Sequence, residues 1–90
     1  MSGQKKNIIL QKSMNVDTPH LEVFAKHKHF YDFFDKTGEL VNFHAEIQEE
    51  LLTAYRYLFD TYYHYQRTCA ACVAGFLTLA YRQYLKYESR

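Results

Sequence analysis

The feature that most constrains the fold is the stretch of residues 39–87, which contains no proline and only one glycine, Gly75. Proline and glycine are the residues that most often end helices, so nothing in this stretch requires an interruption. On a helical wheel at about 100° per residue, its apolar residues from Leu40 to Ala80 fall on one broad face, and charged residues fall on the opposite face. The pattern predicts helix throughout the stretch.

The phase of this face favours a single helix. Leu40 and Phe76 are separated by about ten whole turns at 3.6 residues per turn, so the apolar face stays aligned along the stretch. We therefore expect one very long helix over residues 39–87, about 73 Å in length. The alternative is a hinge near residues 62–67 that divides the stretch into two in-phase helices folded back on each other.

A shorter helix is predicted to precede it, over residues 18–36. Asp17 or Thr18 can accept a hydrogen bond from a free N–H of the first turn, and Pro19 is favoured there because it has no N–H to satisfy. Gly38 suits the left-handed position that ends many helices. This helix is expected to cover only part of the apolar face of the long stretch.

The composition indicates one small globular domain. The chain has 90 residues, 48% of them hydrophobic, with one proline and three glycines, which argues against many short strands. Residues 1–17 are mostly polar and basic, with one apolar cluster formed by Ile8, Ile9 and Leu10. We expect residues 1–17 to form a flexible or extended N-terminal arm and residues 18–90 to form a single helical domain.

The length of the predicted helix implies a partner for it. An uncovered apolar face of this length would expose far more than the few hundred Å² that is usual for a monomer. Residues 39–66 hold one basic residue and five carboxylates, a net charge of −4, and residues 67–90 hold four basic residues and one carboxylate, a net charge of +3. These opposite charges favour antiparallel pairing, either within one chain if the stretch folds back into a hairpin or between the long helices of two chains if it is continuous. We therefore predict an all-α helical bundle completed by homo-oligomerisation.

The contact surface is predicted to lie in the middle of the long stretch, where small residues and aromatic residues alternate. Its members are Leu58, Tyr62, Tyr65, Cys69, Cys72, Gly75, Phe76 and Leu79. A glycine in a helix interior costs about 1 kcal/mol relative to alanine. Gly75 therefore indicates close helix packing, and substitution by leucine is predicted to disrupt the assembly.

The residues that carry chemistry do not form a recognisable active site. Cys69 and Cys72 have CxxC spacing, but redox pairs of this kind lie at a helix N-terminus, whereas the long-helix prediction places these two in mid-helix as buried structural cysteines. His27 and His44 are expected to face the core, and His64 lies too far around the helix from Cys69 to share a metal with it. We predict no catalytic residue, metal or cofactor.

A nucleic-acid interface is the alternative functional prediction. The last part of the chain combines basic residues with tyrosines that can stack on bases. The residues concerned are Arg82, Tyr84, Lys86 and Arg90.

The preferred prediction is a non-enzymatic module that acts by protein–protein contact, as a self-associating adaptor or a small regulator, with another protein as a further potential partner. The most apolar run, residues 68–81, is too short to span a bilayer as a helix, so no membrane association is expected. Two cysteines and no secretory signal point to the cytoplasm.

Overall fold

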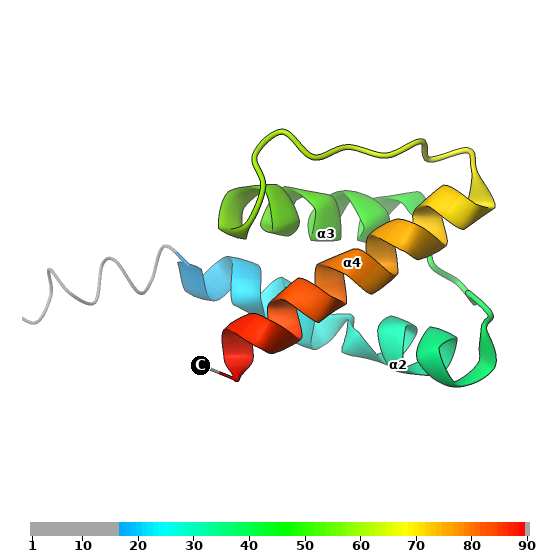
Figure 1. Ribbon diagram of the computed structural model, residues 1–90, viewed down its shortest axis with the longest axis horizontal. Helices are drawn as coiled ribbons and strands as arrows, with labels where there is room; N and C mark the ends of the chain where they lie inside the picture. The colour runs from blue at the N-terminus through cyan, green and yellow to red at the C-terminus, as the bar shows by residue number, and fades with distance from the viewer. Residues whose placement is uncertain (1–16, 90) are drawn as a thin grey trace, which may run out of the picture.

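The computed structural model describes residues 17–89, and every regular element in that range is a helix (Figure 1). In chain order these are a first segment at residues 17–26, α2 (Lys28–Thr37), α3 (Ala45–Leu58) and α4 (Ala70–Glu88). The predicted all-α class is therefore confirmed. The arm predicted for residues 1–17 falls almost entirely outside the described part of the chain.

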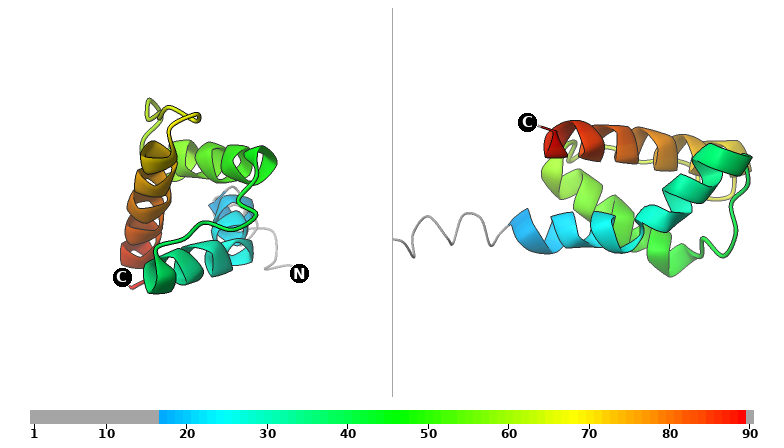
Figure 2. Two further views of the ribbon diagram at one scale, coloured as in Figure 1. Left: turned by 90° about the vertical axis from the view of Figure 1, so that its right-hand side faces the viewer. Right: turned by 90° about the horizontal axis from the view of Figure 1, so that it is seen from below.

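The helix predicted over residues 18–36 is present, but it is interrupted at His27. The N–H of His27 still donates to the carbonyl of Val23 at 3.2 Å, whereas the N–H of Phe30 donates back only three residues, to His27, at 3.1 Å. The first segment and α2 consequently meet at an angle (Figure 2). Gly38 ends α2 as predicted, in the left-handed conformation with φ 77°, and its N–H donates to the carbonyl of Phe34.

The single helix predicted over residues 39–87 is wrong. Residues 38–44 form a connection, so α3 begins only at Ala45, and residues 59–69 separate α3 from α4. The hinge alternative is closer, but the two helices do not form a hairpin. Both start at the end of the molecule where α2 finishes, and both run in the same general direction (Figures 1 and 2). The antiparallel pairing of acidic and basic halves therefore does not occur within the chain.

One apolar core lies between the helices. Its buried side chains come from the first segment, α3, α4 and the 38–44 connection, and they are Phe24, Phe43, Leu51, Leu52, Ala54, Tyr55, Val73, Phe76, Leu77, Ala80, Tyr81 and Tyr84. The α2 helix adds the partly buried Phe30, Tyr31 and Phe34, which pack against this core. The hydroxyl of Tyr81 donates to the backbone carbonyl of Phe24 at 2.7 Å. In an uninterrupted helix the N–H of Lys28 would donate to that carbonyl. The break at His27 thus leaves an acceptor that α4 satisfies.

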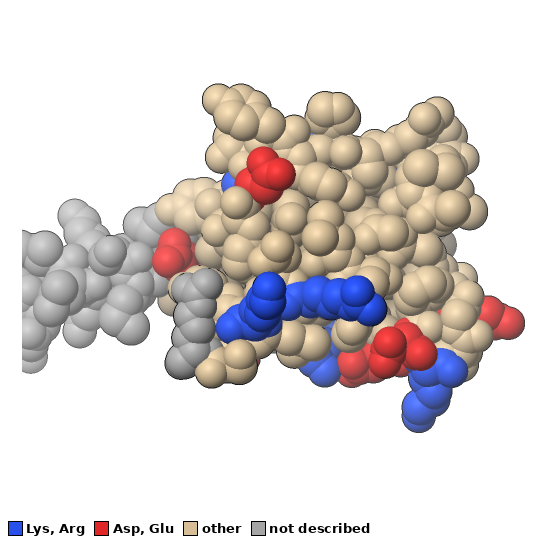
Figure 3. All heavy atoms as spheres, viewed as in Figure 1, with Lys and Arg blue, Asp and Glu red and all other residues tan. Residues whose placement is uncertain are grey.

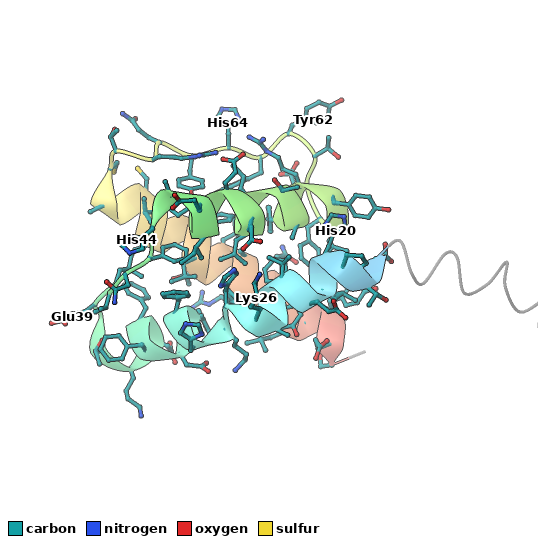
Figure 4. All side chains as sticks on the ribbon, turned by 180° about the vertical axis from the view of Figure 1, so that it is seen from behind. His20, Lys26, Glu39, His44, Tyr62 and His64 are labelled. Atoms are coloured by element: carbon teal, nitrogen blue, oxygen red, sulfur yellow. The ribbon has the colours of Figure 1, made fainter. Side chains whose placement is uncertain are left out.

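The connection at residues 59–69 returns along the bundle and packs on it as an extended segment. Tyr63 and Tyr65 stack against Phe76 with ring centroids 5.7 and 4.6 Å away. The intervening side chain of His64 and the preceding Tyr62 are exposed, and Tyr62 is 87% accessible to solvent (Figure 4). This inward and outward alternation has the period of two that an extended chain imposes.

Polar contacts hold the same connection against α3. The Nε of Arg56 donates to the carbonyl of Tyr63 at 2.7 Å, and the hydroxyl of Tyr65 donates to the side chain of Gln48 at 2.7 Å. Arg67 forms an ion pair with Glu49 at 2.6 Å. The ion pair of the acidic α3 is therefore made with a basic residue of the connection. The α4 helix packs on the other helices mainly through its apolar side chains.

Candidate functional site

The outward side of the first part of α4 carries no charged side chain. Between residues 70 and 81 the helix contains no Lys, Arg, Asp or Glu, and its larger side chains point into the core. The opposite side presents Ala71, Ala74, Gly75, Thr78 and Leu79, which we call the α4 face. In Figure 3, which shows this side of the molecule, Lys and Arg side chains cross the lower middle, other charged side chains lie at the upper left and the lower right, and the remaining surface is formed by other residues.

A shallow groove runs along the α4 face where it meets α2. The groove is lined by Phe34 of α2 and by Ala74, Gly75, Thr78, Leu79 and Arg82 of α4. The groove has a volume of about 410 Å³. A Cβ atom added at Gly75 would meet no heavy atom of a neighbouring element within 4 Å. The groove is therefore wide enough at Gly75 to admit a side chain from outside.

The structure does not bring the predicted contact residues onto one surface. Gly75 is exposed and adjoins the partly buried Leu79 on the α4 face, but Phe76 is fully buried in the core. Tyr62 stands on the outer side of the 59–69 connection, and Leu58 and Tyr65 are half-buried against the core. The helical periodicity assigned Phe76 to the assembly surface because it assumed that another chain would cover it.

The two cysteines lie at the start of α4 and not in mid-helix, which corrects the sequence-based placement. Cys69 is the residue that caps the helix, and its Sγ accepts a hydrogen bond from the backbone N–H of Cys72 at 3.2 Å. Both are free and partly exposed. Hydrogen bonds from the thiol and the backbone N–H of Cys72 lower the pKa of the Cys69 thiol, and the same thiol contact raises the pKa of Cys72.

The histidines occupy separate environments. His27 is buried as predicted, and its Nε2 lies 2.7 Å from a carboxylate oxygen of Glu50. That hydrogen bond is the main reason why the pKa of Glu50 is below its ordinary value. His44 was expected in the core but is exposed at the start of α3, and His20 stacks on Tyr57 at 4.2 Å (Figure 4).

No set of residues suited to a metal occurs in the described part of the chain. Within residues 17–89, no three side chains of His, Cys, Asp or Glu gather closely enough to hold an ion. His64 lies midway along the 59–69 connection, away from the start of α4 where Cys69 and Cys72 are found (Figure 4).

The residues predicted for nucleic-acid contact separate into two groups. Arg82 and Lys86 are exposed on α4. Tyr84 is only 6% exposed and stacks face to face on Phe24 with ring centroids 4.9 Å apart, so its ring is already covered by the core. Arg90 lies outside the described residues. In this structure Tyr84 offers no free ring face to a nucleic-acid base.

Comparison with other proteins adds no assignment, because no protein family, curated protein or solved structure matches this chain. None of the helices described here has the length and apolar character needed to cross a bilayer.

Proposed function

We propose that this protein is a non-enzymatic helical module that self-associates through the α4 face and acts by protein–protein contact, as a cytoplasmic adaptor or small regulator. The fold removes the original reason for a second chain, since the apolar side of α4 is covered by the rest of the chain. The proposal depends instead on the α4 face, which is uncharged, consists mostly of small side chains and is bordered by a groove.

Gly75 is the observation that carries the proposal. A glycine in a helix interior costs about 1 kcal/mol relative to alanine, and close approach of a neighbour is a usual reason for it. No neighbouring element of the described chain lies within 4 Å of the position that its Cβ would take. Contacts among the described residues therefore do not explain the glycine, whereas a helix from a second copy packed into the groove would.

Charge favours an antiparallel arrangement of two α4 helices in such a dimer. A parallel pair would bring the two Arg82 side chains together, and like charges at close range are destabilising. In an antiparallel pair centred near Gly75 and Thr78, the two Arg82 residues lie at opposite ends. Small residues at the crossing point let the helices approach closely, and apolar burial of about 25 cal/mol per Å² supplies the driving force.

Sedimentation equilibrium over a range of protein concentrations tests the proposal. We expect a concentration-dependent dimer for the wild-type chain and a weaker one for Gly75→Leu, because the leucine would overfill the crossing point. An overpacked contact costs about 1–3 kcal/mol, which corresponds to a dissociation constant roughly 5- to 150-fold higher. Circular dichroism of Gly75→Leu should remain helical, since the position is open within the monomer.

Ala25→Leu is the matched control. Ala25 is exposed on the first helical segment, so the substitution adds a leucine to a helix surface that does not belong to the α4 face. Its dimer constant should equal that of the wild type. A wild-type chain that stays monomeric at every concentration would refute self-association, and equal dimer constants for Gly75→Leu and wild type would show that the α4 face is not the interface.

The nucleic-acid alternative is less well supported, because Tyr84 is buried and only Arg82 and Lys86 remain accessible among the described candidates. Two exposed cations provide little of the electrostatic attraction on which such binding depends.

A further inference from the structure

The start of α4 gives Cys69 and Cys72 a geometry that the long-helix prediction excluded. The N–H of Cys69 donates to the carbonyl of Gln66 at 3.2 Å, which closes a turn that leads the chain into the helix. The carbonyl of Cys69 then accepts from the N–H of Val73 at 3.0 Å, the first bond of the helical ladder. Cys69 is thus the last residue before α4, and Cys72 lies in the first turn.

This position makes the two thiols unequal. The Sγ of Cys69 accepts the N–H of Cys72, a group that a helix start leaves without a backbone acceptor. Partial positive charge at the start of a helix also favours a thiolate there. Cys72 donates to the sulfur of Cys69, which favours its own protonated form. One sulfur is therefore prepared as a nucleophile and the other as its proton-bearing partner.

Spacing and access also suit a bond between the two sulfurs. Residues one turn apart in a helix have Cα atoms separated by about 5 Å, within the range of about 4.4–6.8 Å found in disulfides. The extended backbone of Cys69, with ψ 113°, lies outside the helix proper and can adjust to the bond. Both side chains are partly exposed, so a small reagent can reach them.

We propose that Cys69 and Cys72 form a reversible dithiol–disulfide couple that exchanges with small peptide disulfides of the glutathione class. Cys69 is the attacking thiol and Cys72 is the resolving thiol. The inference is independent of self-association through the α4 face, since it concerns a site within one chain.

The exchange proceeds in two balanced steps. The Cys69 thiolate attacks one sulfur of the peptide disulfide, the disulfide bond breaks, and the released thiolate takes a proton from water to leave as a thiol. Cys72 then loses its proton to solvent and attacks the sulfur of Cys69 in the mixed disulfide. The second peptide thiol leaves, again taking up a proton. Overall, one peptide disulfide is reduced to two thiols and the dithiol is oxidised to one intramolecular disulfide.

Incubation of the full chain with glutathione disulfide, followed by acid quenching and mass spectrometry, tests the order of events. The wild type should lose two hydrogen atoms and retain no bound glutathione. Cys72→Ser should accumulate a mixed disulfide with glutathione at Cys69, because the resolving thiol is missing. Cys69→Ser should form the corresponding adduct at Cys72 several-fold more slowly. Circular dichroism of both variants checks that α4 remains helical.

A second measurement separates the effect of the fold from that of the CxxC spacing. Alkylation by iodoacetamide at neutral pH should modify Cys69 several-fold faster than Cys72 in the folded protein, and the difference should vanish in guanidinium chloride. Equal rates in the folded protein, disulfides formed only between chains, or intramolecular oxidation no faster than in an unfolded peptide of residues 66–74 would each overturn the proposal.

Discussion

Replacement of Tyr81 by phenylalanine tests how the interrupted first helix is stabilised. The break at His27 leaves the carbonyl of Phe24 without its helical donor, and the hydroxyl of Tyr81 donates to it at 2.7 Å in a fully buried position. Burial raises the pKa of Tyr81, so the hydroxyl remains protonated and able to donate throughout the pH range of folding experiments. Tyr81→Phe removes the donor and leaves the ring in place.

The expected cost is that of a buried acceptor left unsatisfied, about 1–3 kcal/mol in the free energy of unfolding. For a domain of this size, each kcal/mol lowers the melting temperature by about 4–8 °C. Urea denaturation followed by circular dichroism measures the free energy directly, and the dependence on urea concentration should keep its slope, because the surface exposed on unfolding barely changes.

Tyr55→Phe is the control for this substitution. Tyr55 is buried to a similar degree, with 3% of its surface exposed, and its hydroxyl makes no hydrogen bond to the described residues. Its loss should change stability by less than about 0.5 kcal/mol. The reasoning is refuted if Tyr81→Phe costs no more than Tyr55→Phe, because the break at His27 would then need no donor from α4.

Three further predictions address other parts of the fold. The hydrogen bond from His27 lowers the pKa of Glu50 below its unfolded value, so the stability it contributes is present above the unfolded pKa and is lost as the pH falls through the lower folded-state pKa; acid titration of Glu50→Gln should show a smaller loss of stability than the wild type. Gly38→Ala should lower the free energy of unfolding by about 1–2 kcal/mol, because φ is 77° there, and urea denaturation measures it. Tyr65→Ala should speed tryptic cleavage in the connection between α3 and α4, since the tyrosine packs on the core and bonds to α3; an unchanged cleavage rate would argue that other contacts hold it.

Local signals predicted the first helix well, because its end depends on residues with strong individual preferences. Gly38 takes the left-handed conformation that few other residues tolerate, and the structure ends α2 there. The break at His27 carries no such signal: histidine is an ordinary helix residue, and the break is compensated by Tyr81, which lies far away in the sequence. The periodicity of a sequence cannot predict tertiary contacts between residues so far apart.

The connection at residues 59–69 was anticipated only as the alternative of a hinge near residues 62–67, because its aromatic residues fit both a helical and an extended periodicity. Tyr62, Tyr63 and Tyr65 are close enough in sequence that a helical stripe and an alternating extended segment both find apolar residues where they need them. In the structure Tyr63 and Tyr65 pack on Phe76, as an extended segment allows, and Tyr62 is exposed. Without a Gly, Pro or Asn in the segment, local sequence could not choose between the periods.

The continuous helix predicted through this connection also caused the incorrect placement of the two cysteines in mid-helix. Whether Cys69 caps a helix or sits inside one depends only on where α4 begins, and helix boundaries are the least reliable part of any sequence-based assignment. The CxxC spacing was recognised, and the reason for setting it aside was its expected position. The candidate thiol site was therefore present in the sequence but could be evaluated only with the helix start at Ala70 known.

Energetics explains why the chain folds back when every residue of the connection could be helical. Continuing the helix through residues 59–69 would gain at most about 0.3 kcal/mol per residue, or roughly 3 kcal/mol in all. It would also carry α4 away from the other helices and expose Val73, Phe76 and Leu77, whose burial contributes about 1.5–3 kcal/mol each. Burial of these three alone, roughly 5–9 kcal/mol, outweighs the lost helix. A long helix could recover that burial only from a second chain, at the additional cost of association and only at sufficient concentration. Burial of α4 within its own chain is therefore favoured over burial against a second chain. The outward side of α4 is the surface that stays available to the proposed partner.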